Sequence, residues 1–425
     1  MRHTIFGRLA PRDGRALRRC AALPATVAAV LATSVAVFSA PPASASSASS
    51  ASVSSVFASP ATVSADGSEG RSRYGQAQLQ RDVNAIRELG LIGVQARVTT
   101  SEDGRLYARS GVAQAGTRRP VPVDGYSRIA SVTKSFVATV VLQLVAEEKL
   151  SLDDTVEKWL PGVVTGNGND GSKITIRHLL QHTSGIHDDY PVFGSVEEYY
   201  QHRYDSYTSE QLVARSMRHK PDFEPGRGWG YSNNGYVLIS MIIEKATGRA
   251  WHEEVDRRIS RPLGLRRTVW SGTSHDVPRP HARGYLLLPP DQRVDVTKHF
   301  DGDAAGGLIS TTADVDRFYR ALLGGKLLPP EQLAQMRQTV RATGHEQAWP
   351  GARYGLGIGS RPLSCGGVYW HHGGDDYGYR TRTGVTSDGE RSVVVSMSTQ
   401  FADERSLRQE KAVGDLIDRA LCGTR

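Results

Sequence analysis

Ser131 and Lys134 stand three residues apart in the pattern S-x-x-K, where an irregular segment becomes an apolar, helix-like run. We expect both side chains on one face of the first helical turn, beside backbone N–H groups that have no helical partner. A serine hydroxyl is a poor nucleophile unless a base lies within hydrogen-bond distance, and a lysine held neutral by burial or by a second cation can be that base. The pair is therefore a candidate for acyl transfer. Because short motifs also match by chance, an exposed helix start is the alternative interpretation.

Two further motifs follow along the chain. Tyr231-Ser232-Asn233 precedes a predicted helix. Considered separately, Tyr231 could be a packed aromatic residue at the helix entry and Asn233 could be an N-cap. His372-Gly373-Gly374 lies on a predicted strand, directly after a second histidine. Neighbouring residues on a strand point to opposite faces, and the frame set by Gly374 and Gly378 selects His372 as the histidine that faces a groove.

In this order the three motifs resemble those of the serine hydrolases of the class C β-lactamase and Streptomyces-type D-alanyl-D-alanine carboxypeptidase group. That group carries S-x-x-K, then Y-x-N, then H-x-G or K-T-G. The resemblance runs from about Gln76 to the C-terminus and includes residues 176–186, 304–313 and 354–357. It implies an α+β fold, with an antiparallel β-sheet flanked by helices, an inserted all-helical lobe and the active site in the groove between them.

The resemblance also implies a role for each motif. Ser131 would be the nucleophile, Lys134 and Tyr231 would share the proton transfers, and Asn233 would bind the substrate amide and the lysine. The oxyanion would be bound by the backbone N–H groups of Ser131 and Asp375, and substrate would also contact His372 and Gly374. A phenol ionises near pH 10, so two neighbouring cations would be needed to make Tyr231 useful as a base at neutral pH: Lys134 and a second one, for which His372 is the candidate.

Gly373 departs from the pattern of this group. Many members have a hydroxyl residue at this position, which helps to bind a substrate carboxylate. Its absence puts in doubt the specificity that a carboxypeptidase needs, and Arg380 and Arg382 are candidates to compensate.

The order of predicted elements places strands at both ends of the chain and helices between them. A helix at 76–89 and a hairpin at 91–108 come first, and several strands followed by an amphipathic helix at 407–421 come last. We therefore expect one hydrolase domain at 74–425, with a sheet lobe at about 74–155 and 300–425 and a helical lobe at about 156–299.

The basic character of the chain is concentrated at its N-terminus. The net charge is +8, but residues 1–20 contain six arginines and one acid, and +3 remains without them. No clustered basic stripe with interleaved aromatic residues appears, so a nucleic-acid partner is not expected.

The same N-terminal segment is typical of an export signal. An Ala/Val/Leu-rich run from Ala21 to Ala40 follows the arginines, and Ala43-Ser44-Ala45 offers a small-residue cleavage site, so residues 1–45 are predicted to be a signal peptide. An uncleaved membrane anchor is the alternative, disfavoured by Pro24, Pro41 and Pro42. Residues 46–73 are predicted to be a Ser/Ala-rich linker. We expect a secreted protein, cell-wall associated or free, exported by the general or the twin-arginine route.

Cys365 and Cys422 remain as an even pair after the signal is removed, so a disulfide or two buried thiols are both compatible with the sequence. His178, His182 and His187 suggest a metal site, but no cysteine lies nearby and the HExxH spacing is absent. No metal or cofactor is expected, since the serine mechanism needs neither.

Three functions are compatible with these motifs. The first is a D-alanyl-D-alanine carboxypeptidase or a related D-amino-acid amidase, acting on small molecules or peptides through an acyl-serine intermediate. The second keeps the mechanism but acts as a β-lactamase or a carboxylic-ester hydrolase, because one scaffold can host several chemistries. The third is a non-catalytic cell-wall or β-lactam-binding protein, which the intact motifs disfavour. The oligomeric state stays open.

Overall fold

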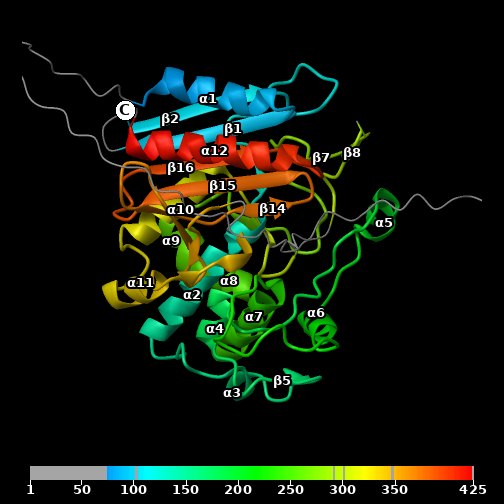
Figure 1. Ribbon diagram of the computed structural model, residues 1–425, viewed down its shortest axis with the longest axis vertical. Coiled ribbons are helices and arrows are strands. Elements are labelled where there is room, and N and C mark those ends of the chain that lie inside the picture. The colour runs from blue at the N-terminus through cyan, green and yellow to red at the C-terminus, as the bar shows by residue number, and fades with distance from the viewer. Residues whose placement is uncertain (1–73, 101–103, 291, 300–301, 346–348, 424–425) are drawn as a thin grey trace, which may run out of the picture.

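The computed structural model describes residues 74–100, 104–290, 292–299, 302–345 and 349–423. The predicted signal peptide and linker lie outside these residues. A sheet lobe and a helical lobe stand one above the other in Figure 1, and helix α2 (Thr133–Ala146) lies where they meet.

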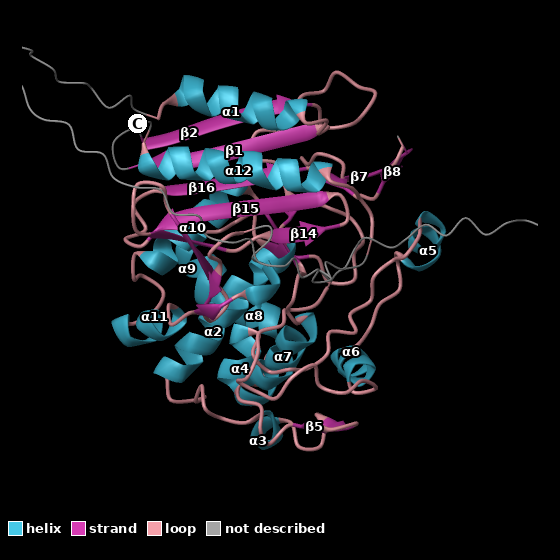
Figure 2. Cartoon of the chain, viewed as in Figure 1, coloured by secondary structure: helices cyan, strands magenta, loops and turns pink. Residues whose placement is uncertain are grey.

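The large sheet joins the two ends of the described chain. Its strand order is β10-β11-β12-β13-β15-β16-β1-β2, with β14 paired to β15. These strands are antiparallel, and β1 fits between β16 and β2, as the cartoon in Figure 2 shows. Their bounds are β1 (Gly93–Thr100), β2 (Gly104–Gly111), β10 (Val340–Arg341), β11 (Arg353–Tyr354), β12 (Gly359–Pro362), β13 (Val368–His371), β14 (Gly374–Asp376), β15 (Tyr379–Thr386) and β16 (Ser392–Met397).

Both faces of the sheet are covered, because its central strands are apolar on both sides. On β16, Val393 and Val395 pack in the core beneath helices α1 (Gln76–Glu88) and α12 (Arg405–Cys422), whereas Val394 belongs to the core of the opposite face. Alternate residues of a strand point to opposite faces, so this segregation follows from the period of the strand. Helix α10 (Thr312–Leu323) covers the opposite face.

Helix α2 is buried on all sides, which explains its continuous apolar sequence. Every residue from Thr133 to Leu142 is buried. A helix that is apolar all round has no solvent-facing side, and α2 packs among helices of both lobes. The first turn of α2 is thereby held rigidly, and it carries Lys134.

The inserted lobe consists of short helices around α7 (Asn233–Thr247), which ends at Gly248 in the left-handed conformation with φ +69°. The other helices of the lobe are α3 (Val156–Trp159), α4 (Ile176–Gln181), α5 (Val196–His202), α6 (Ser209–Ser216), α8 (Trp251–Val255), the π-helical turn η2 (Asp256–Ser260) and α9 (Arg261–Leu263). Helix α11 (Pro330–Met336) lies between α10 and β10 in the chain.

The α+β fold class is confirmed, but the inserted segment is not all helical. The segment includes the short hairpin β4 (Thr165–Gly166) and β5 (Asn169–Asp170), and its helices end at Leu263. Beyond Leu263 lie β6 (Val269–Trp270), β7 (Tyr285–Leu288) and β8 (Gln292–Asp295). Prolines at 278, 280, 289 and 290 remove the N–H groups that a helix needs there, so the apolar run of β7 pairs instead with β8 and β17 (Thr399–Phe401). The strands β3 (Ser127–Arg128) and β9 (Leu308–Ser310) complete a small sheet with β6.

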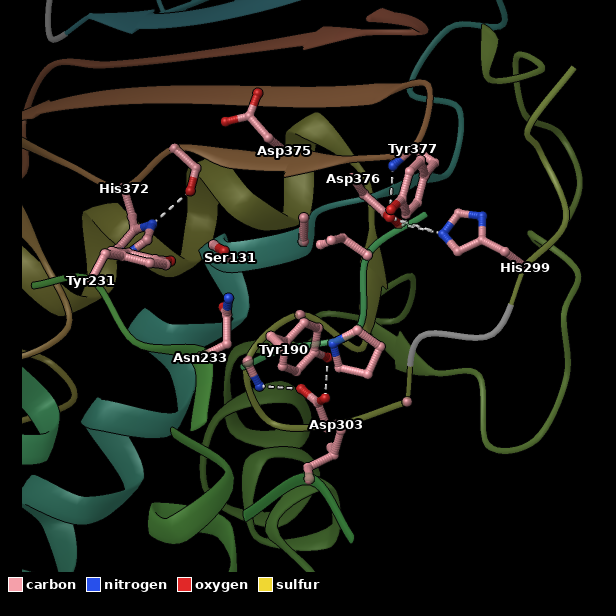
Figure 3. A pocket seen from close by; sticks show the side chains of 18 of the residues that line it. Ser131, Tyr190, Tyr231, Asn233, His299, Asp303, His372, Asp375, Asp376 and Tyr377 are labelled. Atoms are coloured by element: carbon pink, nitrogen blue, oxygen red, sulfur yellow. Dashed lines mark hydrogen bonds and ion pairs between the residues drawn. The ribbon is translucent and has the colours of Figure 1, made fainter. Parts of the chain in front are cut away.

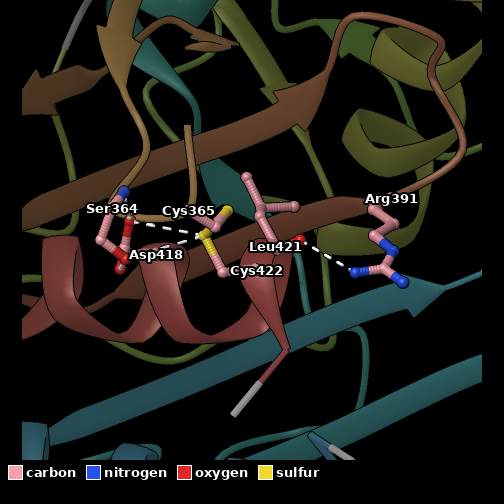
Figure 4. The surroundings of a disulfide bond; sticks show 6 residues. All are labelled: Ser364, Cys365, Arg391, Asp418, Leu421 and Cys422. Atoms are coloured by element: carbon pink, nitrogen blue, oxygen red, sulfur yellow. Dashed lines mark hydrogen bonds between the residues drawn. A yellow bond between two sulfur atoms is a disulfide. The ribbon is translucent and has the colours of Figure 1, made fainter. Parts of the chain in front are cut away.

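Cys365 and Cys422 form a disulfide, which resolves the alternative that the sequence left open. The bond joins the end of α12 to the turn between β12 and β13, and Asp418 of α12 accepts hydrogen bonds from Ser364 beside it (Figure 4). Among the described residues, none of the helices has the length and apolar character that a membrane span needs.

Removing the disulfide should lower stability measurably. The bond closes a loop between residues separated by 57 positions, for which the chain-entropy model gives roughly 4 kcal/mol. We expect the double variant Cys365→Ser/Cys422→Ser to unfold at a lower urea concentration than the oxidised wild type. Reductant should destabilise the wild type and leave the variant unchanged. Equal midpoints for oxidised and reduced wild type would contradict this account.

Candidate active site

Ser131 lies in the short helix η1 (Ala130–Val132), immediately before α2. Ala130 adopts φ +47°, a left-handed conformation that costs energy for a residue with a side chain. This sharp turn brings Ser131 to the wall of a cavity of about 690 Å³ that Tyr231, Asn233 and His372 also line. The three sequence motifs therefore meet in one cavity (Figure 3).

Lys134 is fully buried, and its ammonium group contacts three separate segments of the chain. Nζ lies 3.2 Å from Ser131 Oγ, 2.8 Å from Asn233 Oδ1 and 2.9 Å from the carbonyl oxygen of Ala305. Three acceptors match the three hydrogens of an ammonium group, which offsets part of the cost of burying it. The geometry confines Nζ to a position beside the serine oxygen.

Tyr231 forms a side-chain hydrogen bond with Ser131, and its ring centre lies 4.8 Å from Lys134 Nζ. Burial raises the pKa of Tyr231 well above its ordinary value, and the hydrogen bond with Ser131 only partly opposes this. Desolvation, the largest of these effects, favours the neutral phenol, so it opposes the ionisation for which two neighbouring cations would be needed.

Asn233 is the first residue of α7, and Asp188 determines how its amide is turned. Asp188 Oδ2 accepts a hydrogen bond of 2.9 Å from Asn233 Nδ2, so the amide oxygen faces Lys134. Asp188 Oδ1 accepts from the backbone N–H of Asn234 at 3.0 Å and from the Ser232 hydroxyl at 3.3 Å. Burial raises the pKa of Asp188, while these donors favour its charged form. Sequence reasoning missed Asp188, which is 45 positions from Asn233 and belongs to no short motif.

The third motif lies against the nucleophile. A Cβ at Gly374 would stand 2.0 Å from the carbonyl oxygen of Ile129, so only glycine allows β14 to approach the turn before Ser131. His372 Nδ1 donates to the carbonyl of Gly373 at 2.6 Å, and Nε2 lies within hydrogen-bond distance of the Tyr354 hydroxyl, at 2.7 Å. His372 lines the cavity, but so does His371, contrary to the expectation that only one of the two faces the groove. Strand β13 ends at His371, so the alternation of strand faces does not extend to His372.

Asp375 lines the cavity, and its side chain points away from Ser131 in Figure 3. Partial desolvation opposes its ionisation, but the charges of Arg380 and Arg382 hold the pKa of this carboxyl well below its usual range. Both arginines also bind Glu410. The role expected of the Asp375 backbone N–H concerns a different group and stays a prediction.

Arg380 and Arg382 do not replace the hydroxyl that Gly373 lacks. Both side chains are buried, and every nitrogen of Arg382 is used inside the protein: Nε by Glu410, Nη1 by the carbonyls of Gly374 and Thr381, and Nη2 by Asp375. Guanidinium groups satisfied in this way are not available for a substrate carboxylate.

The opposite wall of the cavity contains groups that the sequence did not reveal. Asp376 Oδ1 lies 2.9 Å from His299 Nε2, and Tyr190 donates a hydrogen bond to Asp303 (Figure 3). Aromatic side chains contribute much of the remaining surface, namely Tyr190, Phe193, Tyr207, Trp251, Trp270, Trp349 and Tyr377. These residues come from loops and helix ends far apart in the chain, so no local pattern marks them.

The three histidines of the suspected metal site serve separate purposes. His178 completes the N-terminal capping box of α4, and His187 pairs with Asp222 at 2.8 Å. His182 has φ +62° at the end of α4, and its Nδ1 accepts from the backbone N–H of Ser232 at 3.1 Å. Its ring centre lies 4.2 Å from that of Tyr231, so His182 packs against the Tyr231 phenol.

Comparisons with known proteins agree with this geometry. Residues 78–416 match the family model described as Beta-lactamase. Penicillin-binding protein 4* of Bacillus subtilis (strain 168) is 32% identical over 238 residues, covering 51% of this chain and 49% of that protein. The chain therefore spans about half the length of this relative.

Two solved structures are similar over most of the chain. A D-stereospecific amidohydrolase from Streptomyces sp. is 39% identical with a TM-score of 0.73, over 83% of this chain and 100% of that chain. The D-amino acid amidase from Ochrobactrum anthropi SV3, complexed with D-phenylalanine, is 28% identical with a TM-score of 0.70, over 81% of this chain and 96% of that chain. With a serine, a buried lysine and a tyrosine in mutual contact, the chain belongs to the β-lactamase family of serine hydrolases.

Proposed function

We propose that this serine hydrolase cleaves amide bonds of D-amino-acid derivatives through an acyl-Ser131 intermediate. The observation that carries this proposal is the lack of a group beside Ser131 that could bind a substrate carboxylate. Gly373 offers no hydroxyl, and the guanidinium of Arg382 next to it is committed to Glu410, Asp375 and backbone carbonyls. A substrate that ends in a carboxylate finds no cation there, whereas an amide needs none.

The cavity favours an aromatic acyl group. Phe193, Trp251 and Trp270 line it together with Tyr190 and Tyr377, and aromatic surfaces of this kind bury a large apolar side chain efficiently. The similar amidase from Ochrobactrum anthropi SV3 was crystallised with D-phenylalanine. D-Phenylalanine amide is therefore the first substrate we would test.

The chemistry follows from the contacts of Ser131. Its Oγ attacks the substrate carbonyl carbon, and its proton passes to the phenol oxygen of Tyr231, which contacts the serine beside the Lys134 ammonium group. The neutral phenol of Tyr231 gives up its own proton as it accepts another, so it relays a proton to the departing amine. Water then attacks the acyl carbon, releases the acid and returns a proton to Ser131. The backbone N–H groups of Ser131 and Asp375 would bind the oxyanion in both steps.

The other activities compatible with the motifs become outcomes of the test. D-alanyl-D-alanine carboxypeptidase activity, which the sequence placed first, would require recognition of a terminal carboxylate. Hydrolysis of β-lactams or simple esters would use the same acyl-serine chemistry with a different shape of substrate.

We also propose that the protein is exported and acts outside the cell, with residues 1–45 as its signal peptide. The disulfide between Cys365 and Cys422 supports this location, because such bonds persist in oxidising compartments.

Purified protein should release ammonia from D-phenylalanine amide. We expect kcat/KM for this substrate to exceed that for L-phenylalanine amide and for D-alanine release from a D-Ala-D-Ala peptide. Ser131→Ala should abolish all three activities, and mass spectrometry should detect the acyl adduct in wild type only. Faster release of D-alanine than of ammonia would return the assignment to a carboxypeptidase, and hydrolysis of penicillin or esters alone would make it a β-lactamase or esterase.

Asp188 should act as a positioning residue for Asn233 and Lys134. In Asp188→Asn, the new side-chain N–H faces the Asn233 N–H, and two donors cannot bind each other. We expect the Asn233 amide to turn, so that its N–H instead of its oxygen faces Lys134. We expect kcat to fall about 100-fold, the loss typical of a misplaced catalytic group, and KM to rise, because the turned Asn233 is also the residue expected to bind the substrate amide.

The neighbouring carboxylate provides a matched control. Asp189 binds Arg215 and His219 on the surface, so Asp189→Asn should retain the wild-type kcat. Equal kcat values for the two variants, at equal thermal stability, would show that Asp188 does not position the site.

A further inference from the structure

The cavity beside Ser131 is lined by several carboxylates that differ in how their charges are balanced. These carboxylates belong to Asp205, Asp303, Asp375 and Asp376. Because a carboxylate taken out of water is costly unless it is paired, each should have a cation or be poised to bind one.

Three of the four have cationic or imidazole partners in the protein. Asp375 binds Arg380 and Arg382, with 2.9 Å between Asp375 Oδ2 and Arg382 Nη2. Asp376 lies 2.9 Å from His299 Nε2 and 4.0 Å from Arg128 Nε. Asp205 lies 2.7 Å from His202 Nδ1.

Asp303 has only uncharged donors close to it. Its Oδ1 accepts from the backbone N–H of Ala305 at 2.7 Å, and its Oδ2 accepts from the Tyr190 hydroxyl. Within the part of the chain that the structure describes, no ion pair is formed at Asp303, and Lys134 acts on it only through its charge at longer range. Burial accordingly raises the pKa of this carboxyl, although the donors and Lys134 oppose the shift.

Asp303 lies close in the chain to a residue that contacts Lys134. Two residues further on, the carbonyl of Ala305 accepts a hydrogen bond from Lys134, which in turn contacts Ser131. In Figure 3 the Asp303 carboxylate lies beneath Tyr190, on the same side of the cavity as Asn233. A group attached next to the carbonyl carbon under attack would therefore lie in the part of the cavity that Asp303 and Tyr190 line.

We propose that Asp303, oriented by Tyr190, binds the free α-ammonium group of the substrate and so restricts the enzyme to substrates with an unblocked amino terminus. This inference rests on the proposed function and adds to it a specificity-determining residue. An ammonium supplies the cation that Asp303 lacks and donates a charge-assisted hydrogen bond to one of the remaining lone pairs of the carboxylate. The face of the Tyr190 ring adds a surface that attracts cations. N-acylated substrates, which carry no charge at this position, should be poor.

Two substrates that differ only in the amino group test this proposal directly: D-phenylalanine p-nitroanilide and 3-phenylpropionic acid p-nitroanilide. We expect wild type to prefer the amine-bearing compound in kcat/KM. Asp303→Asn, which keeps the shape and the hydrogen bond to Ala305, should reduce that preference by about 10-fold to 100-fold, as for loss of a charge-assisted hydrogen bond. A ratio is measured because any general effect on catalysis cancels from it.

Asp205→Asn is the matched control, since Asp205 lines the same cavity but is paired with His202. Its preference should equal that of wild type. An unchanged preference in Asp303→Asn, with D-phenylalanine p-nitroanilide still hydrolysed, would overturn the role of Asp303 and leave the proposed function standing. Failure of wild type to hydrolyse the D-phenylalanine compound would overturn both.

An inhibition experiment on wild type avoids any dependence on how the variants fold. 2-Phenylethylamine carries an ammonium, and 2-phenylethanol has nearly the same shape without the charge. We expect the amine to inhibit hydrolysis at concentrations at least about 10-fold lower, as a charge-assisted hydrogen bond predicts. Equal inhibition by the two compounds would count against an ammonium site.

Discussion

The buried ammonium group of Lys134 is the feature on which the rest of the site depends. Its three acceptors come from the turn before α2, the start of α7 and the loop that precedes β9. Losing water around an ammonium is costly unless each N–H finds a partner, so these segments must meet at one point for the protein to fold with Lys134 inside. The same contacts that satisfy this buried charge hold Lys134 beside Ser131.

A second constraint is the close approach of β14 to the nucleophile turn. Gly374 lies so near the carbonyl of Ile129 that no side chain fits. The next two residues of β14 are held by side chains: Asp375 binds Arg380 and Arg382, and Asp376 binds His299. These contacts keep the strand in place without a covalent link. Asp375 and Asp376 therefore both fix the strand and line the cavity.

Much of the fold was accessible from the sequence because it depends on local patterns. The helices at 76–88 and 405–422 and the hairpin of β1 and β2 appear where apolar periodicity and a glycine turn predicted them. The strands β7 and β8 were missed. One pairing partner of β7 is β17, which comes more than a hundred residues later in the chain. Strand pairing at that distance leaves no periodic signal in the shorter segment.

The sequence by itself determined the chemistry of the nucleophile, since Ser131, Lys134, Tyr231 and Asn233 belong to short motifs whose spacing follows from local helical and loop geometry. The tertiary structure alone decided their electrostatic state. Desolvation raises the pKa of the Tyr231 phenol, and Asp188 turns the Asn233 amide oxygen toward the lysine. The arginines near Gly373 are paired with carboxylates, whereas among the described residues no cation pairs with Asp303. Burial and pairing depend on residues brought together from distant parts of the chain, so only the folded protein defines them.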